Sequence, residues 1–352
     1  MSNSNQPTDE LSQLDHEILR TLVRRNEVIA TLSMQEHLPS VSDENTRLGQ
    51  LIAAQAGGEH QSEFGQVMRH IASLSRAMVQ NHRISFLGPI YSYSHLAAIK
   101  YFGDAAQFDP VSSIPDVFEA VHRGDATSGL VPIENSTDGR IVDTLGMFVK
   151  QHMRICGEVL LPIHHNLLAS GDAEQIREIH SKPQALSQCR GWLAAHFPKA
   201  ELHEVSSTTA AAEAASKDTR VAAVASLPAG RAYGLTVLRA NIEDNQDNVT
   251  RFAVLGTEDT RLTGNDKTSV LFQVEHQPGA LANAMALFSD AGLNLTWIES
   301  FPAPGTHNEY LFFVELSGHQ SEVAVAAAIE RLAQISRRLD VLGSYPVAVL
   351  EA

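Results

Sequence analysis

Hydrophobic positions recur every three or four residues between positions 9 and 80, with an interruption at Pro39. This spacing predicts one helix before the proline and two after it, over about 43–56 and 62–80. Thr8 is placed to cap the first helix, and Gly57-Gly58 to end the second. Three helices alone have a thin core, so this segment is expected to pair with a second copy. The predicted apolar faces consist of Leu11, Leu14, Ile18 and Leu22 on the first helix and Phe64, Val67, Ile71, Leu74 and Met78 on the third.

From position 84 the pattern changes to short apolar strands separated by helices. After a first strand at 84–87, the strand candidates are SGLVPIE, RICGEVLLPIHHNLLA, EIHS, RVAAVAS, LTVLRA and TRFAVLG. This alternation predicts an α/β domain with a largely parallel sheet. The polar stretch EDTRLTGND, ending at position 266, is the expected linker to the last part of the chain.

The last part, 267–352, contains strand candidates at KTSVLFQVE, LNLTWIESFP, EYLFFVEL and LDVLGSYPVAVLE. One helix is expected after HQPGAL and another at SEVAVAAAIERLAQIS. The order is βαββαβ, which predicts a two-layer ferredoxin-like unit.

Composition narrows the class of protein. A length of 352 residues predicts two or three domains, and a net charge of -15 argues against a nucleic-acid partner. The two cysteines form no disulfide framework, which fits a reducing compartment. No apolar run reaches membrane-spanning length, and the first ten residues lack the pattern of a signal peptide. We therefore expect a cytoplasmic protein that has no membrane partner.

Polar side chains follow several of the predicted strands, where α/β folds bind their ligands. Glu134, Asn135 and Ser136 come directly after one strand, although an ordinary turn is the better explanation of these residues taken alone. The four hydroxyls at 206–209 precede an alanine-rich helix. A single cap with spare hydroxyls and a carboxylate-binding cradle explain them equally well.

Two further stretches have the same character. GPIYSYSHLAA (88–98) places hydroxyls between a strand and a helix, and His95 there is either a base or, more commonly, a capping or surface residue. In DNQDNVTRFAVL (244–255), Thr250 and Arg251 enter an apolar strand together. A strand start with one exposed arginine is the ordinary explanation of that pair.

Several classes of site lack support in the sequence. His164 and His165 are adjacent, so they point apart on a strand, and no cysteine or histidine stands at ligand spacing from them. The motifs G-x-S-x-G, G-x-x-x-x-G-K-[ST] and G-x-G-x-x-G are absent. The residues favour a cleft lined by hydroxyls, amides and one arginine, which suits a small carboxylate.

Together these stretches resemble the prephenate dehydratase family. The matching segments, in the family's order, are GPIYSYSHLAA, VPIENSTDGRIVDT, HSKPQALSQC, SSTTAAAEAA, VAAVASLPAGRAYGL and DNVTRFAVLG. The part from 267 onward resembles the ACT regulatory domain, and the N-terminal helices resemble the chorismate mutase domain of the bifunctional P-protein. The expected domains are therefore 1–82 (mutase-like, helical), 83–260 (dehydratase) and 267–352 (ACT).

The resemblance implies a two-lobed, periplasmic-binding-protein-like catalytic domain. The implied reaction converts prephenate to phenylpyruvate in phenylalanine biosynthesis and needs no metal or organic cofactor. In the family the threonine of the Thr-Arg-Phe triplet donates to the leaving hydroxyl, which here is Thr250, and Arg251 is expected to pair with a substrate carboxylate. Asn135 and Ser136 complete the implied catalytic set. The implied substrate-binding residues are Ser92, Ser94, Glu134, Ser207, Thr208, Thr209 and Phe252.

The resemblance also implies an effector, phenylalanine, bound between subunits of a homodimer or homotetramer. The implied effector-binding residues are Gly279, Ala280, Leu281, Glu299 and Ser300. The family's usual arginine after this serine is replaced by Phe301, which predicts weaker binding.

The chain departs from the family at two other places. Tyr91 stands where the first turn usually has a second glycine. In the mutase-like part Arg25 matches one of the basic residues that bind chorismate, whereas Thr8, Glu36 and Val79 stand where other binding residues are expected. A carboxylate at position 36 repels a dianion, so we expect this part to have lost mutase activity.

Three other interpretations are weighed against a dehydratase. A bifunctional mutase–dehydratase requires the mutase pocket to work despite these departures. A non-aromatising prephenate decarboxylase shares the fold, but the intact triplet at 250–252 argues against it. A non-catalytic sensor of small carboxylates would also use a two-lobed cleft, and the same triplet makes it the weaker hypothesis.

Overall fold

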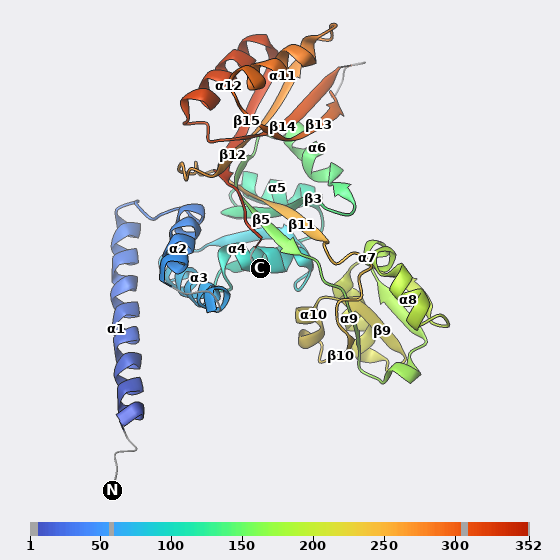
Figure 1. Cartoon of the computed structure of the whole chain (residues 1–352). Coiled ribbons are helices and arrows are strands. Elements are labelled where there is room, and N and C mark those ends of the chain that lie inside the picture. The colour runs from blue at the N-terminus through green and yellow to red at the C-terminus, as the bar shows by residue number, and fades with distance from the viewer. Residues whose placement is uncertain (1–5, 56–59, 304–308, 351–352) are drawn as a thin grey trace. The chain divides into compact units, whose positions relative to one another are not determined.

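The computed structural model describes residues 6–55, 60–303 and 309–350, and the chain divides into two compact units (Figure 1). The first unit comprises residues 1–82 with 102–107, and the second comprises 83–101 with 108–352. Within the described residues, no helix is both long enough and apolar enough to cross a membrane.

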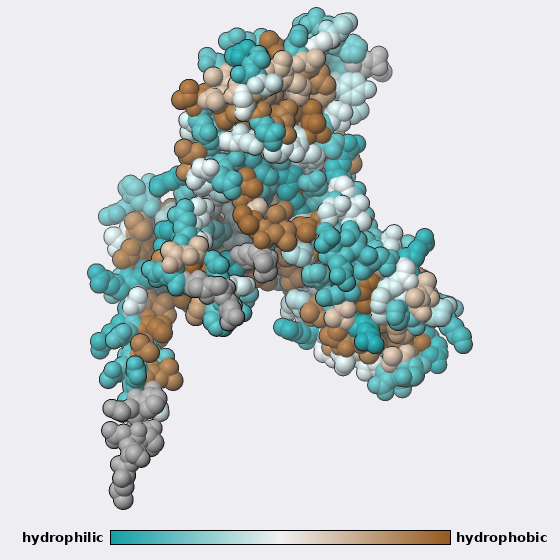
Figure 2. Space-filling view, viewed as in Figure 1, coloured by the Kyte–Doolittle hydropathy of each residue, from teal (hydrophilic) through white to brown (hydrophobic). Residues whose placement is uncertain are grey.

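The first unit contains the three predicted helices: α1 (Gln6–Met34), α2 (Val41–Gln55) and α3 (Gln61–Ala77). Since α1 begins at Gln6, Thr8 lies within the helix and does not cap it, while Gly57-Gly58 lies outside the described residues. The buried core is small, consisting of Leu48, Ile52 and Ala72. Most of the predicted apolar faces are exposed on this chain, and hydrophobic side chains are visible along α1 in Figure 2.

The second unit begins with the first lobe of a two-lobed α/β domain. Its sheet has the order β2-β1-β3-β11-β5, with β4 paired to β3. The prediction of a largely parallel sheet is wrong, because β11 returns from the other lobe and runs antiparallel to both β3 and β5. The elements of this lobe are β1 (Arg83–Leu87), α4 (Tyr93–Phe102), β2 (Gln107–Val111), α5 (Ile114–His122), β3 (Ser128–Asn135), β4 (Gly139–Arg140), α6 (Val142–Lys150), β5 (Arg154–Pro162) and β11 (Val249–Gly256).

The second lobe has its own sheet, in the order β10-β6-β9-β7-β8. Here β7 is parallel to β8 and β9, and β6 is antiparallel to β9 and β10. The chain crosses between the lobes twice, from β5 to β6 and from β10 to β11, so the two sheets face a shared cleft. The elements are β6 (Asn166–Ala169), η2 (Ala173–Gln175), β7 (Glu178–Ser181), α7 (Pro183–Gln188), α8 (Arg190–His196), β8 (Glu201–Glu204), α9 (Thr208–Lys217), β9 (Val221–Ala225), α10 (Leu227–Ala232) and β10 (Thr236–Arg239).

The C-terminal part confirms the predicted βαββαβ order. Its antiparallel sheet has the order β13-β14-β12-β15, and both helices pack on one face. The elements are β12 (Asp266–Val274), α11 (Ala280–Asp290), β13 (Leu295–Pro302), β14 (Tyr310–Ser317), α12 (Val323–Ile335) and β15 (Ser336–Pro346).

The other face of this sheet joins the core of the first lobe. Phe313 and Tyr345 of the sheet belong to one buried cluster with Phe118 and Phe148 of the lobe, and Phe148 and Phe313 have ring centroids 6.3 Å apart. Because close-packed interiors transmit strain, a structural shift in one sheet can displace the side chains of the other through this shared apolar core.

Candidate active site

The cleft of the catalytic domain holds a cavity of about 340 Å³, which is large enough for a small organic acid. Seven of the predicted site residues line it: Ser92, Ser94, Asn135, Ser207, Thr208, Thr250 and Phe252. The remaining predicted residues of the catalytic domain, Glu134, Ser136, Thr209 and Arg251, are not among the lining residues.

Thr250 and Asn135 form the polar centre of the cavity wall. They are directly opposite each other on the antiparallel strands β11 and β3. The amide oxygen of Asn135 accepts backbone hydrogen bonds from Thr137 and Asp138, each 2.9 Å long. Its amide nitrogen therefore faces Thr250 and donates to Oγ1 over 2.8 Å. Because Thr250 Oγ1 is the acceptor in this contact, its own hydrogen is available to a ligand in the cavity.

A chain of hydrogen bonds continues from Asn135 towards the second lobe. Asn135 donates to Asn248, Asn248 donates to Gln188, and Gln188 Oε1 lies 2.8 Å from His165 Nε2. An amide oxygen only accepts, so Nε2 of His165 carries the proton and Nδ1 does not. The Tyr93 hydroxyl lies 3.0 Å from Nδ1 and donates to the carbonyl of His164 over 2.8 Å. Burial lowers the pKa of His165 and raises that of Tyr93 well above its usual value. Both groups are therefore neutral, and they fix the geometry of the cleft.

The second lobe supplies a set of donors to the same cavity. Ser207 caps α9, accepting from the Ala210 backbone over 3.0 Å, and its neighbour Thr208 lines the cavity. Thr209 instead donates to the carbonyl of Ile90 over 3.2 Å. Lys182, at the end of β7, also lines the cavity. A cation beside a capped helix N-terminus favours an anionic ligand.

Arg251 lies on the opposite face of β11 from the cavity. Successive residues of a strand point to opposite faces, so Thr250 and Phe252 face the cavity and Arg251 faces the ACT sheet. Its guanidinium is 2.6 Å from Glu315 on β14 and 3.3 Å from Glu158 on β5. This placement provides no contact between Arg251 and a ligand in the cavity.

The partners of Arg251 form a buried ionic cluster. Lys267 is 3.1 Å from Glu158, and the guanidinium of Arg251 lies 4.7 Å from the centre of the Trp297 ring. Burial opposes the charge of Arg251, but Glu315, Tyr345 and Glu158 offset it, and the pKa is raised. The cluster thus connects the strand that carries Thr250 to the ACT sheet.

Three other sequence candidates are placed outside the cavity. Glu134 points to the Arg251 side of the sheet, with 3.2 Å between Oε2 and the arginine Nε. Ser136 bridges β3 and β11 by accepting from the backbone of Val249 over 2.9 Å. His95 is buried beside Phe86, and burial lowers its pKa, so it is a packed core residue.

The backbone conformation of Tyr91 is one that glycine adopts more easily, and glycine is the residue that the resemblance leads us to expect at this position. Its φ is 67°, in the left-handed region that side chains with a Cβ disfavour. The residue keeps this conformation because its backbone N–H donates to His95 Nδ1 over 3.1 Å and its carbonyl accepts from Ser226 over 3.2 Å. Tyr91 thus shapes the turn next to the cavity and does not itself line it.

The predicted effector residues lie on two elements of the ACT part. Gly279 precedes α11 with a φ of 82° and has open space on its Cβ side. Ala280 is buried, and Leu281 packs against the core between the helices and the sheet. Glu299 and Ser300 are on β13 and alternate between its two faces.

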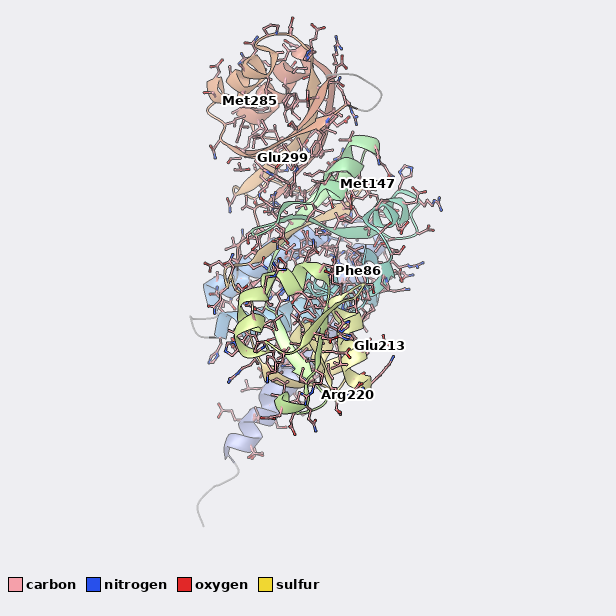
Figure 3. The ribbon with its side chains drawn as sticks, turned by 90° about the vertical axis from the view of Figure 1, so that its right-hand side faces the viewer. Phe86, Met147, Glu213, Arg220, Met285 and Glu299 are labelled. Carbon is pink, nitrogen blue, oxygen red and sulfur yellow. The ribbon has the colours of Figure 1, made fainter. Side chains whose placement is uncertain are left out.

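Glu299 is on the face of β13 that points to the catalytic domain, as Figure 3 shows. Its carboxylate forms an ion pair with Arg140 of β4. Phe301 is buried in the shared core, and the Arg140 guanidinium lies 5.9 Å from its ring centre. An arginine at position 301 would therefore bring a second cation next to Arg140.

Sequence reasoning missed eight polar residues of the cavity or its network: Tyr93, Asp138, Asp143, His165, Lys182, Gln184, Gln188 and Asn248. A signal was present for all of them except His165, because the others lie in the stretches GPIYSYSHLAA, VPIENSTDGRIVDT, HSKPQALSQC and DNVTRFAVLG. The role of His165 depends on a partner that lies 72 positions away in the sequence, and no local pattern reveals such a contact.

Comparisons with known proteins identify the family of the chain. The family model described as prephenate dehydratase matches residues 84–260, and the ACT domain model matches residues 268–334. A bifunctional chorismate mutase/prephenate dehydratase from Aquifex aeolicus is 38% identical over 354 residues, covering 97% of this chain and 97% of the relative.

Two solved structures are similar to the greater part of this chain. The prephenate dehydratase of Arthrobacter aurescens in complex with L-phenylalanine has a TM-score of 0.70 and 34% identity, covering 76% of this chain and 93% of its own. A protein described as a quorum-quenching acylase has a TM-score of 0.70 and 30% identity, covering 76% and 98%. The extent of the family match and the full-length similarity to the Aquifex relative show that the chain belongs to the prephenate dehydratase family and carries a C-terminal ACT domain.

Proposed function

We propose that the cavity catalyses the decarboxylative dehydration of prephenate to phenylpyruvate, with Thr250 as the proton donor to the leaving hydroxyl. The supporting observation is the hydrogen bond from Asn135 to Thr250 Oγ1. In the reaction the bond from the ring to its carboxylate breaks, the electron pair enters the ring, and the C4–oxygen bond breaks as the oxygen takes a proton. Carbon dioxide and water leave.

A threonine hydroxyl is a weak acid, and the amide of Asn135 makes proton donation by Thr250 more favourable. When the hydroxyl proton moves towards the leaving oxygen, negative charge develops on Oγ1. A donor already aimed at that atom stabilises the charge without reorganisation. Phe252, on the same face of β11, offers an apolar surface beside the forming aromatic ring.

The substrate is a dianion, so its carboxylates need donors. We assign this role to Lys182 and to the hydroxyls of Ser207 and Thr208 at the start of α9. Ser92 and Ser94 line the cavity from the first lobe and add two further hydroxyls. These roles support binding and orientation, while Thr250 acts in the chemical step.

The direct test of this function is turnover of prephenate by the purified full chain. We expect phenylpyruvate to form with release of carbon dioxide and no added metal or cofactor. Formation of a decarboxylated product that keeps its hydroxyl would instead support the decarboxylase alternative.

We propose that residues 1–82 form a mutase-like segment, followed by the dehydratase at 83–260 and the ACT domain at 267–352. Two arginines of the helical segment form ion pairs with one buried carboxylate. Glu44, 6% exposed, lies 2.7 Å from Arg25 and 3.1 Å from Arg76. A carboxylate in this position competes with the dianion that a mutase must bind.

We expect purified protein to convert chorismate to prephenate at a negligible rate. The physical reason is that Glu44 occupies Arg25, while Glu36 and Val79 offer no cation. The measurement follows chorismate disappearance, with prephenate turnover by the same preparation as the positive control. Robust mutase activity alongside normal dehydratase activity would overturn this expectation.

We also propose that the protein is a homodimer or homotetramer joined in part through α1. Six apolar side chains of α1 are each between 50% and 62% exposed: Leu11, Leu14, Ile18, Leu19, Val23 and Val28. A stripe of this kind on a helix normally packs against another apolar surface.

Light scattering on the full chain is expected to give at least twice the chain mass of 38.2 kDa. The double substitution Leu14→Asp with Ile18→Asp should lower the measured mass, because it places charge in the apolar stripe. The matched control is Asp15→Asn with Glu17→Gln, which leaves the stripe intact. A monomeric wild type would contradict the proposal.

Phenylalanine is the proposed effector, bound through the start of α11 and through β13. The open left-handed turn at Gly279 admits close backbone approach, and the helix start offers N–H groups to a carboxylate. The ion pair between Glu299 and Arg140 then couples β13 of the effector site to β4, next to the active site. Arg140 is paired in register with Glu134 on β3, the strand that ends at Asn135.

We expect Arg140→Gln to bind phenylalanine but to show reduced inhibition of prephenate turnover, because the link from β13 to β4 is broken. Calorimetry measures binding, and initial rates with added phenylalanine measure inhibition. Arg154→Gln, which removes the exposed pair with Asp259, is the control. Lack of binding by the wild type would contradict the effector proposal. Unchanged inhibition of Arg140→Gln would contradict only this route.

A further inference from the structure

The second lobe carries a repeated motif that the dehydratase reaction does not use. Glu178-Ile179-His180 forms most of β7, and Glu201-Leu202-His203 forms most of β8. The two strands are parallel and neighbouring, with Glu178 opposite Glu201 and His180 opposite His203. Residues two apart on a strand share a face, so both histidines and both glutamates lie on the same side of the strand pair.

The side-chain atoms converge at spacings that suit a metal ion. Glu178 Oε2 lies 2.9 Å from His180 Nε2 and 3.7 Å from His203 Nε2, and Glu201 Oε2 lies 3.5 Å from His203 Nε2. Candidate ligand atoms of Glu178, His180 and His203 all lie within 4.8 Å of one another. Four ligands in a tetrahedron with bonds of about 2.1 Å are separated by about 3.4 Å.

Two ring nitrogens in this cluster, Nδ1 of His180 and Nε2 of His203, form no hydrogen bond with any described residue. The second is the candidate ligand atom, and it has two carboxylates at ion-pair distance, 3.5 Å and 3.7 Å away. The side chain of His203 is 44% exposed, yet its Nε2 is shielded from solvent. A buried polar atom without a hydrogen-bond partner is uncommon and calls for an explanation such as an ion. The nearby cation Arg220, labelled below Glu213 in Figure 3, does not supply a partner, because it forms its ion pair with Asp218 at 2.8 Å.

We propose that Glu178, His180 and His203 bind a divalent transition-metal ion of the Zn²⁺ class. Imidazole and carboxylate ligands in a tetrahedral arrangement are typical of zinc. His180 and His203 would bind through Nε2 and Glu178 through Oε2, which leaves the fourth position to a water molecule or, after its exposed side chain turns inward, to Glu201. The proposal is independent of the dehydratase function.

The position of the site suggests what the ion would do. Beyond their carboxyl ends, β7 leads to Lys182 and β8 leads to Ser206, and both residues line the cavity. β8 is the edge strand of its sheet and is paired on one side only, to β7. An ion that bridges the two strands would therefore hold the edge strand, and the hydroxyl-rich turn after it, in place.

The test is titration of the full-length, metal-free protein with Zn²⁺ against a chromophoric chelator, repeated with Co²⁺ followed by its visible absorption. The chain has 16 histidines, so weak background binding is expected and must be separated by control variants. We expect one strong equivalent in the wild type, and in Co²⁺ the intense absorption of a tetrahedral complex.

His180→Ala with His203→Ala should weaken this equivalent by at least about 100-fold, since losing even an outer partner of a ligand commonly costs about 10–100-fold. The double control His122→Ala with His196→Ala removes two exposed histidines elsewhere and should bind like the wild type. Glu178→Gln is a milder second variant that checks the result if the histidine pair fails to fold. Equal stoichiometry and affinity in the wild type and both site variants would overturn the proposal, as would an equal loss in the control.

Discussion

Thr250→Val is expected to reduce kcat for prephenate by about 10²–10⁴-fold while leaving KM within a few-fold of the wild type. Valine keeps the shape and strand preference of threonine but removes the hydroxyl that donates to the leaving oxygen. That contact matters mainly in the transition state, so its loss appears in turnover and not in substrate binding. Steady-state kinetics of phenylpyruvate formation measures both parameters.

Thr250→Ser is the matched control, because it keeps the hydroxyl and the hydrogen bond from Asn135. Its turnover should stay far closer to that of the wild type than to that of the valine variant. Turnover near the wild-type level in Thr250→Val would remove Thr250 from the chemical step.

Arg251→Met should lower the free energy of unfolding by about 3–5 kcal/mol, because it leaves buried carboxylates without their main partner. The side chains of Glu315 and Glu158 are only 1% and 4% exposed, so water cannot take the place of the guanidinium. Lys267 remains next to both glutamates and keeps the loss towards the lower end of this range. Denaturant unfolding of the variant and the wild type measures the difference.

The control for Arg251 is Arg83→Met, which removes a half-exposed pair with Asp109 and should cost less than about 1 kcal/mol. The KM for prephenate separates the two roles considered for Arg251. The structure predicts a small change, because the guanidinium faces the ACT sheet. A KM raised many-fold in a variant of unchanged stability would instead support the substrate-carboxylate role inferred from the sequence.

Thr250 and Arg251 show how far the site could be predicted from the sequence. The Thr-Arg-Phe triplet identified the right strand, and period-2 alternation already implies that Thr250 and Arg251 point in opposite directions. Which of the two faced the cleft was not decided by local pattern. It depends on Glu315, which stands 64 positions later in the chain and belongs to another domain.

In the fold, too, features set by local pattern were predictable, whereas features set by distant contacts were not. The βαββαβ order was predictable because each element of the ACT part carries its own periodicity. The sheet of the first lobe was mispredicted because the direction of β11 is set by the return of the chain from the second lobe. The helical faces of α1 and α3 followed from spacing, but spacing does not show whether a face is buried within the chain, and most of these residues are exposed on it.

Some site residues could be recognised from their local position, whereas others depend on contacts with distant parts of the chain. Ser92, Asn135 and Thr208 stand next to strand ends or helix starts, and such positions can be recognised locally. His165 was set aside because it lacks metal-ligand spacing. Its role comes from Gln188 and Tyr93, which approach it from the second lobe and from α4.

The most direct measurement of the central claim is a double-mutant cycle on kcat with Thr250→Val, Asn135→Ala and the pair together. If Asn135 acts by stabilising charge on Thr250 Oγ1, removing the amide should have little further effect once the hydroxyl is gone. We predict that each single variant loses turnover and that the double variant is no slower than Thr250→Val by more than a few-fold. Fully multiplicative losses, or an Asn135→Ala variant with wild-type turnover, would contradict the account.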